Sequence, residues 1–302
     1  MIGKEMSEWG PIDKGECMVS ETGDETQKQG VDVDQYYATS LSEFTNALEQ
    51  AIATSHQASG HDAGPRRFWA SVLFTRLCSI GVSILWLCPQ SPVNLDGLHW
   101  DFSSLASLVR NLFECALSFF YLGIELVGDE EWQVRLRVMQ LHDCMGRLRM
   151  FRDFGSSDEQ LSGFEAQADE LRTHLSSNGY FMSLPDSLRR KLLRGEQASM
   201  LTQDEVLHRM GEFEQRTRGY YRFLSSHTHS FPLAFYRMTE HNRGRGEENE
   251  VDKGHMAAAI EFASGVLTRT TTDMQAAFKD VVAFNLGKFN WQILRARRDA
   301  RS

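Results

Sequence analysis

The strongest constraint on the fold comes from residues 105–127, where apolar side chains recur at helical spacing. They cover about half of a helix circumference and leave only a narrow polar stripe, so such a helix must be surrounded by other elements. A second apolar stretch, residues 70–88, must likewise be surrounded by other elements. No segment shows the alternation of apolar and polar residues that is typical of a half-buried strand. The sequence therefore predicts an all-α fold, a multi-helix bundle of about eight to ten helices in a single domain.

Both apolar stretches are long enough to be mistaken for membrane spans. Arg76 lies near the middle of the first, and the second contains Arg110, Glu114 and Glu125. Each of these charges is costly in a lipid core. We therefore expect two buried helices of a soluble protein and no membrane partner.

Charge is concentrated at the N-terminus. The formal net charge is −9, of which residues 1–50, with three Lys against eleven Asp and Glu, carry about −8. Residues 1–34 show no apolar period, which predicts an acidic, disordered tail. A hydrophobic content of 41% is enough for a sizeable core, so residues 35–302 are expected to form one all-helical domain.

The cysteines show no metal-ligand spacing, and no apolar run follows a basic start in the first 40 residues. We therefore expect reduced core thiols and a cytoplasmic location. The cysteines are Cys17, Cys78, Cys88, Cys115 and Cys144.

Capping signals and prolines divide the chain into helices. Ser40-Leu-Ser-Glu43 and Thr202-Gln-Asp-Glu205 have capping-box spacing, and Pro232 should end a helix near His229. The expected helices are 40–56, 65–87, 105–127, 132–154, 157–174, 186–194, 202–229 and 256–284, followed by a short C-terminal helix.

The densest polar segment is Arg222-Phe-Leu-Ser-Ser-His227-Thr-His229-Ser230. At about 100° per residue, Arg222 and His229 lie within about 20° of one another, and His227 lies about 140° from Arg222. The negative end of the helix dipole favours a protonated imidazole there, which suits general acid/base work, and an arginine would bind phosphate. In the alternative interpretation, the serines and histidines only satisfy local hydrogen bonds.

At this segment the chain resembles the HEPN superfamily, helical proteins whose ribonuclease members carry an Arg, four to six residues and a His. Arg222 to His227 has four intervening residues and Arg222 to His229 has six. The residue after the Arg is usually polar in that superfamily, whereas here it is Phe223.

The HEPN resemblance implies RNA cleavage without metal, as in a toxin or defence component. A histidine would activate a 2′-hydroxyl while Arg222 steadies the phosphate, in a cleft at a homodimer interface. Arg137 to His142 has the same spacing, and many HEPN members lack nuclease activity. The alternative is a non-catalytic helical interaction or regulatory protein.

The segment 225–232, with its Ser-x-His-x-His-Ser pattern, and the helix 108–114 also resemble an uncharacterised all-helical bacterial family, over roughly residues 65–284. The function of that family is unassigned. This resemblance implies the helical fold and nothing about chemistry.

Arg110 and Glu114 are spaced i, i+4 on the polar stripe of the apolar helix. They would form a structural ion pair, or Glu114 would orient His227 or His229 as a carboxylate orients a catalytic imidazole.

Cofactor and metal motifs are not present in the sequence. It has no P-loop, GxGxxG, GxSxG or HExxH pattern, and a single Glu205-Val-Leu-His208 lacks the second copy that a di-iron bundle needs. We therefore expect no metal and no cofactor. Basic clusters at 135–152, 189–194 and 295–301 would contact phosphate or form solvated helix faces.

Overall fold

The structure is a computed structural model that describes residues 32–61, 64–211, 215–236, 238, 243–285 and 291–292. The regular structure in these residues consists of eleven α-helices and one π-helix, without a strand, and nine of the α-helices have seven or more residues. The predicted all-α fold class is therefore confirmed. The N-terminal tail and most of the predicted C-terminal helix lie outside the described residues.

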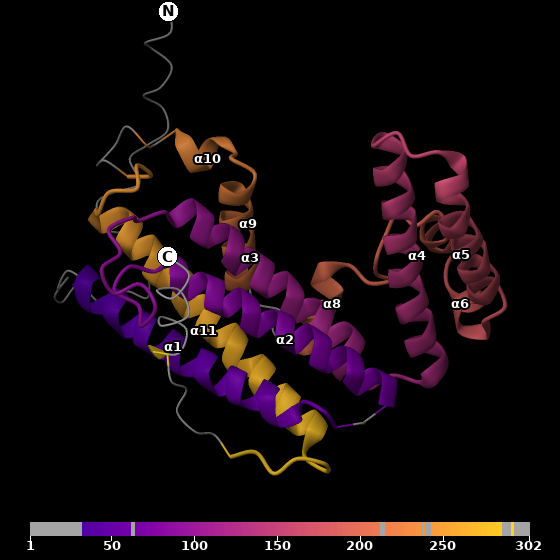
Figure 1. Ribbon diagram of the computed structural model, residues 1–302, viewed down its shortest axis with the longest axis horizontal. Helices are drawn as coiled ribbons and strands as arrows, with labels where there is room; N and C mark the ends of the chain where they lie inside the picture. Colours follow the sequence, from indigo (N-terminus) through magenta and orange to yellow (C-terminus); the bar gives the residue numbers. More distant parts are fainter. Residues whose placement is uncertain are drawn as a thin grey trace, which may run out of the picture.

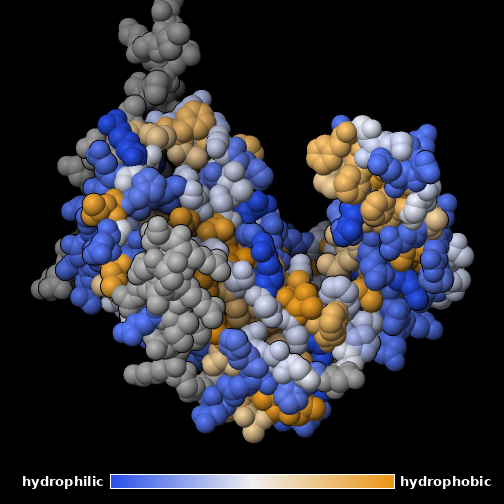
Figure 2. Space-filling model, in the orientation of Figure 1, coloured by the Kyte–Doolittle hydropathy of each residue, from blue (hydrophilic) through white to orange (hydrophobic). Residues whose placement is uncertain are grey.

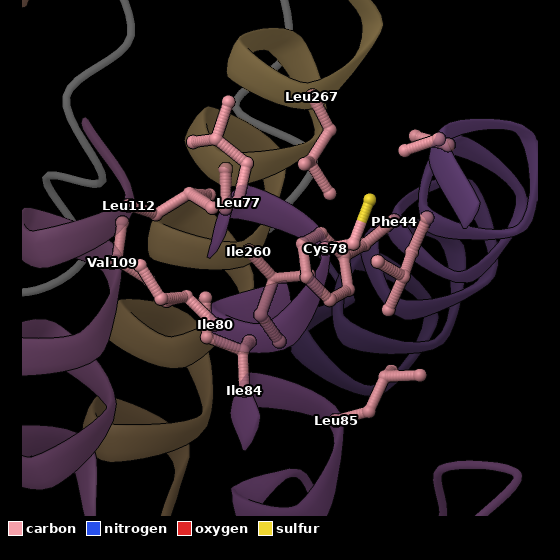
Figure 3. Packing of buried hydrophobic residues seen from close by; sticks show 14 of the residues in the cluster. Phe44, Leu77, Cys78, Ile80, Ile84, Leu85, Val109, Leu112, Ile260 and Leu267 are labelled. Carbon is pink, nitrogen blue, oxygen red and sulfur yellow. The ribbon is translucent and has the colours of Figure 1, made fainter. Parts of the chain in front are cut away.

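Four long helices form the body of the molecule (Figure 1): α1 (Val33–Ala58), α2 (Gly64–Leu87), α3 (Phe102–Phe119) and α11 (Glu250–Phe278). Their inward faces share one continuous hydrophobic core. Figure 3 shows Phe44 of α1, Ile80 and Ile84 of α2, Val109 of α3 and Ile260 of α11 meeting there. The core thus joins segments that lie more than two hundred residues apart in the sequence.

The two most apolar helices are packed into this body. By length and composition, α2 and residues 102–124 are long and apolar enough to cross a membrane, and 44% and 61% of their most apolar windows are buried inside the protein. After Phe119 the chain continues as the π-helix η1 (Phe120–Ile124). A Cβ on Gly123 would lie 2.8 Å from the Ala70 Cα, so η1 and α2 approach more closely than a side chain would allow.

A separate arm extends from the body (Figure 1). It contains α4 (Asp129–Asp153), α5 (Asp158–Ser176), α6 (Gly179–Ser183) and α7 (Asp186–Leu193), packed around a second hydrophobic cluster. Figure 2 shows the surface hollowed between the arm and the body.

The base of the arm is held by a buried ion-pair network. Arg135, which is fully buried, donates to Glu125 Oε2 at 2.6 Å, to Glu131 Oε1 at 2.5 Å and to the Tyr121 carbonyl at 2.6 Å. The prediction that this arginine contacts phosphate or lies on a solvated face is therefore wrong, because its guanidinium is used inside the fold.

Three shorter helices complete the chain: α8 (Gln203–Met210), α9 (Gln215–Thr228) and α10 (Pro232–Phe235). The capping box of Thr202 and Glu205 that opens α8 is confirmed. The single helix predicted from here to residue 229 is wrong, because Gly211 adopts a left-handed conformation (φ 74°) and ends α8.

The first and last helices begin earlier than predicted. The capping box expected at Ser40 and Glu43 is wrong, since both residues lie inside α1, and Asp32 caps its amides instead. Asn249 likewise caps α11, which starts six residues before the predicted Met256 and ends at Phe278. Residues with capping-box spacing inside α1 therefore led to a wrong prediction of where this helix begins.

The cysteines of the described residues, Cys78, Cys88, Cys115 and Cys144, are buried and unpaired, as predicted. Burial raises the pKa of the Cys78 and Cys88 thiols to about 12. These thiols are therefore protonated and inert at neutral pH. Cys17 lies outside the described residues.

Candidate functional site at the end of α9

The polar segment singled out in the sequence lies at the C-terminal end of α9. The helix ends at Thr228, close to the end predicted from Pro232. Ser230 adopts a positive φ of 49°, and the Phe231 amide donates to the Ser226 carbonyl at 2.9 Å. This turn closes the helix and leads into α10.

His227 points from α9 toward α3 and is half-buried. Its ring packs edge-on against Phe102, at 4.6 Å between centroids, and against Phe223, at 5.0 Å. Its Nδ1 lies 3.2 Å from the Ser103 Oγ. The imidazole therefore has a fixed orientation, with one nitrogen engaged by a hydroxyl.

A second imidazole shares the same aromatic surroundings. His255, from the first half of α11, lies 5.1 Å from the Phe102 ring and 5.3 Å from the Phe223 ring. Phe102 and Phe223 stack on each other at 5.5 Å. We call the set of Phe102, Phe223, His227 and His255 the imidazole box.

A loop from residue 243 to residue 249 closes this end of the body. The Gly244 amide donates to the buried carboxylate of Asp252 at 2.6 Å, and Asn249 Nδ2 donates to the same oxygen at 2.7 Å. The Trp100 amide donates to the Gly246 carbonyl at 3.0 Å. These bonds place Arg243 beside the N-terminal turns of α11, which carry Asp252 and His255.

The surroundings keep both imidazoles uncharged. Burial lowers the pKa of His227, the positive charge of Arg243 lowers it further, and Asp252 partly opposes this. The pKa of His255 falls to about 4, through burial first and then the positive charge of Arg243, while Asp252 again partly opposes the shift. The predicted dipole effect of the helix end is therefore outweighed by burial, and each ring is a neutral proton acceptor at pH 7.

Arg222 and His229 lie apart from the box. Both side chains are exposed, as expected from their common face on the helix, and His229 contacts the Phe231 ring at 5.5 Å. Within the part of the chain that the structure describes, the Arg222 guanidinium makes no hydrogen bond or ion pair, and only its backbone carbonyl accepts, from Ser226 Oγ at 2.9 Å.

Glu114 belongs to a different cluster, between α3 and α9. It pairs with Arg110 at 2.7 Å and accepts a hydrogen bond from the Tyr221 hydroxyl at 3.0 Å. Arg110 also donates to that hydroxyl at 3.1 Å. The Glu114 carboxylate thus joins α3 to α9. The side chain that contacts the His227 ring nitrogen is the hydroxyl of Ser103 and not Glu114.

The sequence did not single out Phe102, Ser103, Arg243 or His255. They come from two helices and a loop, and no local spacing links them to His227. One signal in the sequence could have indicated His255: it lies next to the apolar face of α11, and that face must pack against another helix in a helical bundle.

The fold and the site define an all-helical protein with two neutral imidazoles enclosed by phenyl rings and an exposed arginine on the same helix as one of them. The chain belongs to DUF5677, a family of unknown function, whose family model matches residues 67–247. That span includes α9 and the loop that carries Arg243, and it lies within the region expected for the uncharacterised helical family. No curated protein and no solved structure matches the chain.

Proposed function

We propose that this protein is a HEPN-like helical protein that cleaves RNA without a metal ion, as a toxin or defence component would. One observation carries the proposal: His227 is an oriented, neutral imidazole at the end of α9, five residues after the exposed Arg222. A neutral imidazole is the group that general-base catalysis needs at physiological pH.

The reaction assigned to this site is attack of a 2′-hydroxyl on the neighbouring phosphate. In the tautomer in which Nδ1–H of His227 donates to the Ser103 Oγ, Nε2 has the lone pair that accepts the 2′-hydroxyl proton. The bond from the 2′-oxygen to phosphorus forms, the bond from phosphorus to the 5′-oxygen breaks, and that oxygen takes a proton from water. The products are a 2′,3′-cyclic phosphate and a free 5′-hydroxyl.

Arg222 and His229 extend the site onto the surface. Arg222 would hold a phosphate of the same strand, since a guanidinium binds phosphate bidentately. Close to His229, four apolar side chains are exposed: Phe231, Leu233, Phe235 and Tyr236 are between 45% and 69% accessible. Figure 2 shows hydrophobic surface over this α10 region. A second copy of the chain would cover it, which agrees with the homodimer that the HEPN resemblance implies.

The same apolar surface supports a second candidate, a non-catalytic helical protein that binds a partner through α10. A contiguous set of exposed aromatic side chains is typical of interaction sites. Under this alternative the imidazole box is part of the hydrophobic packing, and its histidines are neutral because they are buried.

Cleavage of a mixed pool of structured RNAs in EDTA separates the two candidates. We expect His227→Ala and Arg222→Ala to reduce the rate by at least about 100-fold, the usual effect of losing a general base or a phosphate-binding cation. His229→Ala reports whether the exposed imidazole contributes. His174→Ala, an exposed histidine on the arm, is the matched control and should cleave like wild type.

Circular dichroism must show that each variant is folded. Cleavage that survives both His227→Ala and Arg222→Ala contradicts the assignment of this site. A wild-type protein that leaves the pool intact contradicts the nuclease and favours the interaction protein.

A further inference from the structure

A cavity of about 280 Å³ lies where α8 and α9 pack against α3 and α11. Each of the four helices contributes to its walls, with Phe113 from α3, Met210 from α8, Tyr220 from α9 and Phe262 from α11. A cavity of roughly 150 Å³ is enough to hold a benzene molecule. The space between these helices therefore has room for one aromatic ring with a small substituent.

The apolar wall of this cavity is built from aromatic rings. Phe262 stacks on Tyr220, at 5.2 Å between centroids and with an angle of 11° between the ring planes. Phe113 contacts Phe262 at 5.3 Å. Met210 and Val266 lie beside these rings in the wall. A flat aromatic molecule is the kind of ligand that packs well against such a surface.

The α11 wall is left open by a glycine. Gly265 lines the cavity one helical turn after Glu261 and one turn before Arg269, and a Cβ on Gly265 would meet nothing within 4 Å. Glycine in the middle of a helix lowers stability relative to alanine. At this position the missing side chain leaves space that a ligand can occupy.

The two charged residues in the wall differ in their partners. Arg269 is already engaged, since its Nε donates to Asp273 Oδ2 at 3.1 Å and its Nη2 donates to the Met210 carbonyl at 3.2 Å. Glu261 accepts a hydrogen bond from the Tyr36 hydroxyl at 2.5 Å. Within the described residues, no cation forms an ion pair with Glu261. One edge of the cavity therefore carries a negative charge that a ligand can neutralise.

We propose that this cavity binds a small aromatic cation, a single ring that carries an amino or amidino group. The ring would pack against Phe262 and Tyr220, and the cationic group would pair with the Glu261 carboxylate. Aromatic faces attract cations as well as other rings, so both parts of the ligand interact favourably with the same wall. This binding site goes beyond RNA cleavage and does not depend on it, because it shares no residue with the imidazole box.

A ligand in this cavity would also stabilise the packing of α8. Phe113 and Met210 belong to the small hydrophobic cluster between α3 and α8, and Phe262 and Val266 pack against that cluster. A molecule that binds the folded state and not the unfolded chain raises the temperature of unfolding. We therefore expect the ligand to increase the melting temperature of the protein.

Three probes of nearly the same shape test the charge preference: benzamidine is a cation, benzamide is neutral and benzoate is an anion. The full chain, labelled with ¹³C at its methyl groups, is titrated with each probe, and the Met210 and Val266 signals report on the cavity. We expect saturable shifts, with benzamidine binding about tenfold more tightly than benzamide and benzoate binding most weakly. The methyl signal of Met182, which is exposed on the arm, should not shift.

Two substitutions separate the role of the carboxylate from that of the cavity. In Glu261→Gln, benzamidine should bind only as tightly as benzamide, because the charge is removed and an oxygen that accepts from Tyr36 is kept. Gly265→Leu should abolish binding of both probes, since its side chain fills the cavity. The matched controls lie on α5: Glu170→Gln and Gly163→Leu, both at exposed positions, should bind like wild type.

The proposal is wrong if no probe shifts the Met210 and Val266 signals, if benzoate binds as tightly as benzamidine, or if benzamidine still binds more tightly than benzamide in Glu261→Gln. It is equally wrong if Gly265→Leu, shown by circular dichroism to be folded, binds benzamidine as wild type does. These outcomes concern the cavity alone, and RNA cleavage by the same protein is decided separately by the His227 and Arg222 variants.

Discussion

The folded protein holds His255 uncharged against Phe102 and Phe223, with its pKa lowered from 6.5 to about 4. The unfolded chain protonates the same histidine near pH 6.5. Between these values the unfolded state binds more protons, so the stabilisation is complete above pH 6.5 and is lost as the pH falls toward 4. His227, whose pKa is also lowered, acts in the same direction.

We therefore predict that the free energy of unfolding decreases between pH 7 and pH 4.5, with His255 contributing on the order of 2–3 kcal/mol. Urea unfolding at a series of pH values measures it. In His255→Phe, which preserves the ring and removes the titration, the decrease should be smaller by that amount. Equal pH dependence in both proteins would show that His255 is solvated in the folded state.

The functional residues show where sequence reasoning reaches its limit. Arg222, His227 and His229 were found because they lie within eight residues of one another. Ser103 contacts His227, and His255 contacts Phe223, only through the packing of α3 and α11 against α9. Helical periodicity gave the relative directions of Arg222 and His227, but the direction of the core at this point depends on contacts across the whole body.

At the scale of helices, the sequence predicted most elements correctly, because their signals are local. The capping box at Thr202 and the apolar period of α3 need only a few neighbouring residues. The errors occurred where another residue determines the end of a helix. Asp32 rather than Ser40 caps α1, and Gly211 ends α8 within a continuous apolar stripe. An apolar stripe in the sequence shows which face of a helix is buried. It does not show whether the chain is interrupted between two helices that bury the same face.

Gly211 provides a direct test of that break. Its φ of 74° is costly for an L-residue, although a Cβ there meets nothing within 4 Å. We predict that Gly211→Ala destabilises the protein by about 1 kcal/mol through backbone strain alone.

The matched control is Gly265, in the middle of α11, where a Cβ likewise meets nothing within 4 Å. Here the backbone is helical, so Gly265→Ala should stabilise by about 0.5–1 kcal/mol. The same glycine-to-alanine substitution is thus expected to change the free energy of unfolding in opposite directions at two positions that both have space for a Cβ. Thermal unfolding compares them, and a stabilising Gly211→Ala would mean that α8 and α9 can form one continuous helix.

At the scale of the whole molecule, the hydrophobic residues divide between the body and the arm. The arm has its own cluster around α4 and α5, and the body has the cluster of α1, α2, α3 and α11. They are connected by a small third cluster where α8 meets α3 and η1, and by the ion pairs of Arg135. Few apolar contacts cross this connection, so the arm can open while the body stays folded.

Hydrogen exchange on two matched core variants tests this division. Leu175 of the arm and Leu267 of the body are both fully buried, so each truncation to alanine should cost about 2–5 kcal/mol. We predict that Leu175→Ala speeds amide exchange in α4–α7 and leaves α1 and α11 unchanged. Leu267→Ala should speed exchange in the body and also in the arm, because the base of the arm packs on η1, the continuation of α3. If both variants speed exchange equally everywhere, the body and the arm unfold as one cooperative unit. The arm is then a fixed side of the hollow between arm and body, and it does not open separately.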